Sequence, residues 1–345
     1  MMHRSSILIF LAILIVVFIS ATALVSTSFE LEPGMRVSKV LAILGDDDLG
    51  HYPDTNVRGV SAERGRQLVF DGIASKPGGG STRRQSKHFV CTSCHNTKRE
   101  DPDLRYSDPQ ARLEYTNEQK MPFLQATSLY GVVNRETFYN GDYEKKYGEL
   151  VYAARNDIRG AIQLCAVECA QGRKLKNWEL ESILSFLWTI DLKIEDLNLD
   201  EDQYDYLASA LKGNTDQDSA ISIVKSRYIS GSPAHFGSAY ASHQSTEKLT
   251  GNSENGKLIY ENSCLHCHKE RRYSFFNLDD EKITFQHLNS KAGGYGHHSI
   301  YQVIRYGVFS KAGKRSYMPQ YPLEKLSDQQ LKDLESYIEY RAKAD

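Results

Sequence analysis

The sequence contains the pattern Cys-x-x-Cys-His twice, and this pattern is typical of covalent haem attachment. The two copies are Cys91-Thr-Ser-Cys94-His95 and Cys264-Leu-His-Cys267-His268. Two thiols about one helical turn apart can form thioether bonds to the vinyl groups of a haem, and the adjacent histidine can ligate the iron. We therefore predict two covalently bound haem c groups, held by the four cysteines, with His95 and His268 as proximal ligands.

Cys-x-x-Cys pairs also occur in zinc sites and in thioredoxin-type redox proteins. A thioredoxin-type pair is expected within a βαβ unit, and strand signals are sparse throughout this sequence. The two pairs lie far apart in the chain, and each is followed by a histidine within a similar local pattern. These features favour haem over zinc or thiol redox chemistry.

The setting of each motif is repeated, which indicates an internal duplication. A helix start with Ser61 as a possible cap leads into Gly65 and an apolar cluster, and Ser253 leads in the same way into Gly256. The first copy carries an insertion rich in glycine before its motif. Each copy ends in a predicted amphipathic helix, over 178–188 in the first and after Ser327 in the second.

The second copy resembles class I cytochrome c over residues 251–345. A first helix, the motif, a helix at 299–306, a loop that reaches Met318-Pro319 and a final helix follow in the same order. The resemblance implies that Met318 is the second axial ligand of this haem. The competing histidines are expected at the surface or near the haem propionates, and they are His287, His297 and His298.

The sixth ligand of the first haem has several candidates. Ile158, Ile162, Cys165 and Cys169 follow one another at helical spacing, which predicts that both thiols point toward the interior. The thiols could instead be buried without a role, or they could form a short disulfide. Met121 is the other candidate ligand, and Cys169, a histidine or an open site remain further possibilities.

The first copy resembles, over 61–192, the di-haem thiosulfate dehydrogenases that form tetrathionate and the related sulfur-oxidation cytochromes. The resemblance rests on the segment Cys165-Ala-Val-Glu-Cys169-Ala-Gln-Gly172-Arg173-Lys174-Leu175, which is followed by a helix. It implies that Cys165 ligates the first haem iron. The family tends to have Ser at the position of Cys169 and Lys at the position of Tyr317, so its ligand switching is not implied here.

We predict a mostly α protein, with two tandem cytochrome c-like helical domains behind an N-terminal apolar helix. The first domain covers 61–192 and the second covers 251–345. A polar spacer at 26–60 and an ordered connector at 193–250 flank the first domain. The chain of 345 residues is long enough for two hydrophobic cores. Its composition, 40% apolar and 25% charged, argues against a wholly disordered protein. Its six cysteines are too few for a scaffold built on disulfides.

The first 25 residues indicate export. Residues 7–19 are apolar without interruption after a weakly basic start. A small-residue site at 21–23 would suit cleavage of a signal peptide, whereas extension to Val25 gives nearly enough length to span a bilayer. We therefore expect a periplasmic protein, or one at the outer face of the cytoplasmic membrane that residues 7–25 anchor.

These observations leave two classes of function. Thiolate lowers the potential of a haem iron and His/Met ligation raises it, so electrons would pass from the first haem to the second. The favoured function is electron transfer to a redox partner, such as another cytochrome or a respiratory complex. The alternative is a thiosulfate dehydrogenase-like enzyme, with basic groups for the anion drawn from Arg135, Arg155, Arg159, Arg173 and Lys174. A net charge of −2 gives no support for nucleic-acid binding.

Overall fold

The protein is mostly helical, as the sequence predicts. The computed structural model describes residues 29–46, 50–292, 299–308 and 318–344, and within these ranges β structure is limited to isolated bridges. The predicted N-terminal apolar helix at 7–25 lies outside the described residues. No helix in the described ranges combines the length and apolar character needed to cross a membrane. The α-helices are α2 (Val37–Ile43), α3 (Ala62–Asp71), α4 (Pro109–Glu118), α5 (Gly141–Tyr147), α6 (Ile158–Leu164), α7 (Asn177–Leu187), α8 (Glu201–Leu211), α9 (Gln217–Lys225), α10 (Ala239–Thr246), α11 (Ser253–Ile259), α12 (Leu265–His268), α13 (Lys282–Ala292), α14 (Ile300–Tyr306) and α15 (Asp328–Lys343).

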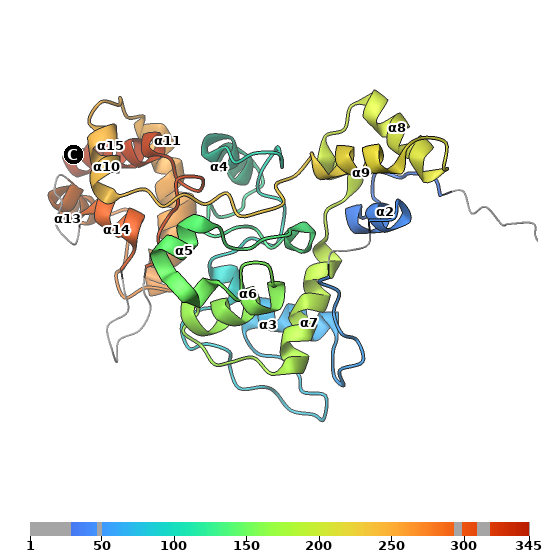
Figure 1. Cartoon of the computed structure of the whole chain (residues 1–345). Helices are drawn as coiled ribbons and strands as arrows, with labels where there is room; N and C mark the ends of the chain where they lie inside the picture. Colours follow the sequence, from blue (N-terminus) through green and yellow to red (C-terminus); the bar gives the residue numbers. More distant parts are fainter. Residues whose placement is uncertain (1–28, 47–49, 293–298, 309–317, 345) are drawn as a thin grey trace, which may run out of the picture.

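The first helical unit is built on the contact of α3 with α7. Leu68 and Val69 of α3 share a core with Ile183 and Leu184 of α7. Gly65 makes this close approach possible, because a Cβ atom at that position would lie 1.8 Å from the backbone oxygen of Ser182. Figure 1 shows α3 and α7 grouped with α6.

The second helical unit repeats this contact with α11 and α15. A Cβ atom on Gly256 of α11 would lie 2.0 Å from the backbone oxygen of Asp333 on α15. The helix α15 begins as predicted, because the Ser327 hydroxyl accepts a hydrogen bond of 3.1 Å from the Gln330 amide. The predicted duplication therefore has a structural counterpart, in which each unit packs its first helix against its last through a glycine.

A third core joins the two segments that flank the first unit. The helix α2 packs Val37, Val40 and Leu41 with Leu207 of α8 and Val224 of α9, and the three helices form a separate group in Figure 1. The sequence analysis treats 26–60 as a spacer and does not predict α2. The signal was present, because apolar residues at 37, 40, 41 and 44 follow helical spacing.

The helix α4 connects the two units. It follows the first motif in the chain, yet its Leu113 and the nearby Phe123 are completely buried in the core of the second unit. The backbone amide of Phe123 donates to the Asn262 oxygen at 2.9 Å, just before the second motif. The chain that leaves the first motif therefore packs directly on the segment that leads into the second.

Candidate haem sites

The two motif histidines are oriented in the same way. The Nδ1 atom of His95 lies 2.6 Å from the Thr127 carbonyl oxygen, and the Nδ1 atom of His268 lies 2.9 Å from the Phe276 carbonyl oxygen. A carbonyl oxygen can only accept, so Nδ1 carries the proton and donates in both rings. This tautomer leaves the Nε2 lone pair of each ring available for an iron. Burial lowers the pKa of both histidines, which favours the neutral ring.

The second motif opens onto a cavity of about 540 Å³. This volume falls within the range of about 300–1,000 Å³ typical of ligand cavities, and the lining is mostly apolar and aromatic. The cavity is lined by both attachment cysteines and by both predicted ligands, which are Cys264, Cys267, His268 and Met318. His287 also lines it but is solvent-exposed, and His297 and His298 lie outside the described residues.

Backbone pairing and a glycine position Met318. Val308 and Met318 exchange two backbone hydrogen bonds, of 2.8 and 3.1 Å. Gly307 has a φ of 72°, and a Cβ atom there would lie 2.2 Å from the Met318 oxygen. The Tyr321 hydroxyl lies 2.5 Å from the Ser263 hydroxyl beside Cys264. The methionine segment is therefore fixed against the second motif.

The thiols of the first unit lie on a widened helical turn. The helix α6 continues into the π-turn η4 (Cys165–Cys169), and the side chains of Cys165 and Cys169 hydrogen-bond each other. Cys165 is partly buried and Cys169 is exposed, and both thiols lie near Cys94 of the first motif.

Gln85 and Gly172 hold this turn against the segment that leads into the first motif. The Gln85 side-chain amide donates to the Ala166 oxygen at 2.7 Å, and the Arg173 amide donates to the Gln85 oxygen at 2.9 Å. A Cβ atom on Gly172 would lie 2.3 Å from the Gln85 Nε2 atom. The fold therefore requires glycine in the Cys165–Leu175 segment that carries the resemblance.

The structure brings Cys165 together with the first motif. The hydrogen bond with Cys169 and burial raise the pKa of the Cys165 thiol, and the nearby thiols of Cys91 and Cys94 add to this effect. Without a neighbouring positive charge the protonated thiol is therefore favoured. A bound metal ion supplies such a charge and deprotonates a coordinating thiol.

Met121 is buried after α4, near the contact with the second unit. Its neighbours Leu113 and Phe123 belong to the core of the second unit rather than to the first. The Met121 segment also reaches the first motif, because the Asn96 side-chain amide donates to the oxygen of the adjacent Pro122 at 3.0 Å. The choice between Cys165 and Met121 as the ligand therefore stays a prediction.

The two motifs touch each other at their central residues. The ring of His266 lies close to the backbone of Ser93, and burial lowers the pKa of His266 to about 4. Burial also raises the pKa of Cys94, and the nearest thiol outside its own unit, Cys267, raises it further. The Gln125 side chain lies close to Cys94 and also lines the cavity of the second motif.

Aromatic rings continue this contact. Phe89, just before the first motif, lies with its ring centroid 6.4 Å from that of Tyr273, and both side chains line the second cavity. The sequence analysis did not identify His266, Gln125 or Phe89 as site residues. Nothing in local spacing marks them, because their role depends on how the two units pack.

Most cations considered for an anionic substrate are paired with carboxylates. Arg155 pairs with Glu144 at 2.8 Å, Arg159 with Glu181 at 2.7 Å, and Arg173 with Glu179 at 2.5 Å. Lys174 is exposed.

Arg135 differs from these cations. Its guanidinium makes no hydrogen bond or ion pair with any residue in the described ranges, and burial lowers its pKa. Tyr143 is close enough to interact electrostatically with both Arg135 and Cys169. The carboxylates of Asp101 and Glu100 are close enough to act on Arg135 electrostatically, and a haem propionate would add a direct ion pair.

The donor set fits haem better than a shared zinc ion. Over the described ranges, no group of three or more His, Cys, Asp or Glu side chains converges to hold a metal ion. Each cysteine pair instead stands beside its own histidine, whose Nε2 is available.

Comparison with known proteins identifies the second unit. Residues 251–338 match the family described as cytochrome c oxidase, cbb3-type, subunit III. This segment forms a cytochrome c domain. The domain implies covalently bound haem c and a role in electron transfer, which confirms these predictions in general terms. The match covers about a quarter of the chain, and no curated protein and no solved structure matches the sequence.

Proposed function

We propose that the protein is an exported di-haem c-type cytochrome that passes electrons to a redox partner protein. The observation that carries this proposal is the direct contact of two complete attachment motifs, through His266 and Ser93. Each motif has its histidine in the tautomer that an axial ligand needs. A six-coordinate haem iron alternates between ferric and ferrous states and therefore exchanges one electron at a time.

In this proposal the first site has His95 and Cys165 as axial ligands and the second has His268 and Met318. Thiolate ligation lowers the potential and methionine ligation raises it, so electrons pass from the first site to the second. The fold holds the sites together, because Gln125 contacts Cys94 and lines the second cavity. A short path between the sites favours transfer within the molecule before transfer to the partner.

The proposed location follows from the sequence of the first 25 residues. An export segment would place both sites outside the cytoplasm, where haem c is attached. Residues 7–25 would be removed as a signal peptide or would anchor the protein at the outer face of the cytoplasmic membrane. Intact mass of the mature protein distinguishes the two arrangements.

The alternative function is oxidation of a small sulfur anion at the first site, as the resemblance to thiosulfate dehydrogenases implies. One observation favours it, which is the unpaired guanidinium of Arg135 near Tyr143 and Cys169. A dianion could bind there, but a haem propionate would meet the same need. The paired arginines 155, 159 and 173 give this alternative no support.

The test begins with the number of haems. Pyridine haemochrome absorbance per protein and intact mass should both give two covalent haems, and a value of one would refute the di-haem proposal. A redox titration should then give two separated midpoints. Turnover of thiosulfate with a ferric acceptor would favour the enzyme, and its absence with intact haems would favour the carrier.

A further inference from the structure

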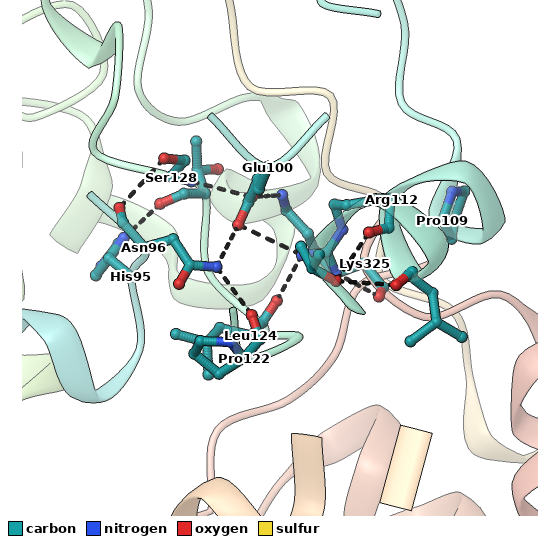
Figure 2. A network of polar contacts seen from close by, with 12 residues as sticks. His95, Asn96, Glu100, Pro109, Arg112, Pro122, Leu124, Ser128 and Lys325 are labelled. Carbon is teal, nitrogen blue, oxygen red and sulfur yellow. Dashed lines mark hydrogen bonds and ion pairs between the residues drawn. The ribbon is translucent and has the colours of Figure 1, made fainter. Parts of the chain in front are cut away.

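A buried charge cluster connects the first motif to the second unit, and its centre is Glu100 (Figure 2). The Glu100 side chain is 1% exposed. Its carboxylate accepts a hydrogen bond of 2.6 Å from the Lys325 ammonium and lies 3.5 Å from the Arg112 guanidinium. Lys325 lies between Met318 and α15, whereas Glu100 follows the first motif by only a few residues.

The same carboxylate holds the two segments that orient His95. It accepts a hydrogen bond of 2.9 Å from the Asn96 side-chain amide and one of 3.2 Å from the Ser128 backbone amide. Asn96 directly follows His95, and Ser128 directly follows Thr127, whose carbonyl accepts from the His95 ring. Glu100 therefore fixes both the histidine and its hydrogen-bond acceptor.

Arg112 adds a structural connection across the same junction. Its guanidinium donates to the Leu124 oxygen at 3.0 Å and to the Lys325 oxygen at 2.8 Å, and it stacks over the Phe123 ring. Burial alone would raise the pKa of Glu100, but Lys325 and Arg112 outweigh it and lower the pKa to about 2. The carboxylate is thus ionised, and its charge also acts on His95.

We propose that Glu100 is a positioning residue for the first haem site and that Lys325 of the second unit is its counter-charge, so that docking of the second unit completes the first site. This inference rests on the proposed di-haem function. It follows from the geometry that a residue of the cytochrome c domain controls the environment of the haem in the other unit. A buried carboxylate so close to the proximal histidine stabilises the ferric state, and its buried ammonium partner opposes that effect.

The test compares Glu100→Gln and Lys325→Met in the full-length protein loaded with haem. Glutamine keeps the shape of Glu100 and removes its charge, so the midpoint potential of the first haem should rise. Lys325→Met removes a positive charge, so that potential should fall, although the substitution lies in the other unit. Lys343→Met is the matched control, because that lysine is exposed and pairs with Glu339 instead.

The measurements are spectroelectrochemical midpoints and the EPR g-values of the oxidised protein, with the midpoints assigned by Cys165→Ala and Met318→Ala. Lys325→Arg keeps the charge and should restore the first-site potential. Shifts in the same direction for both variants, or shifts no larger than those of Lys343→Met, would overturn the inference. Fewer than two haems in the unsubstituted protein would instead refute the function on which it rests.

Discussion

The imidazole ring of His266 lies close to the backbone of Ser93, and each of these residues lies between the two cysteines of its own motif. The two attachment segments therefore pack directly against each other. The contact explains why Cys267 raises the pKa of Cys94. It also makes the separation of the two sites a property of the fold rather than of a flexible linker.

Removal of this contact should weaken the junction between the units. In His266→Ala, the loss of buried packing against Ser93 and the cavity that remains should destabilise the protein by roughly 2–3 kcal/mol. Denaturant unfolding followed by Soret absorbance measures this change. His266→Gln fills part of the same space and should recover part of the stability, and equal losses in both variants would argue against a role for this packing contact.

Substitution of the two thiols should shift the first-site potential in opposite directions. Cys165→Ala removes the proposed thiolate ligand, so the potential should rise and the low-spin EPR signal of that site should change. Cys169→Ala removes a hydrogen bond to the thiolate, so electron donation increases and the potential should fall. An unchanged first-site EPR signal in Cys165→Ala would exclude this residue as the ligand.

Gly65 and Gly256, the glycines at the two helix–helix contacts, should not tolerate even a methyl group. A Cβ atom would lie 1.8 Å from Ser182 O at Gly65 and 2.0 Å from Asp333 O at Gly256. Gly65→Ala and Gly256→Ala must therefore separate the packed helices, at a cost of about 3 kcal/mol or more. Gly78→Ala is the control, because no atom lies within 4 Å of its Cβ position. Thermal unfolding of the three variants would show whether only the first two are destabilised.

Acid should weaken the charge cluster in a defined pH range. The pKa of Glu100 is lowered from 4.5 to about 2, so its contribution to stability is present above pH 4.5 and is lost as the pH falls toward 2. Glu100→Gln lacks this titration. The thermal midpoint of the unsubstituted protein should therefore fall more steeply than that of Glu100→Gln over this range, and parallel curves would contradict the assignment.

The local features of the sequence predicted the local features of the fold. Cap residues and apolar spacing identified α7, α14 and α15, because these signals act within one or two turns. Contacts between distant segments were not predictable. Glu100 and Lys325 are 225 residues apart, and neither residue type nor spacing marks them as partners. The position of the helix α4 was equally unpredictable, because its apolar residues pack in the core of the other unit.

The direct packing of the two motifs also limits the order in which haem attachment and folding can occur. An enzyme that attaches haem must reach each cysteine pair, yet the packed units leave all four attachment cysteines only partly exposed. We therefore expect haem attachment to precede the packing of the two units against each other. The haems would then assist folding in addition to carrying electrons. A Cys264→Ser/Cys267→Ser variant should still acquire the first haem, which mass spectrometry can verify.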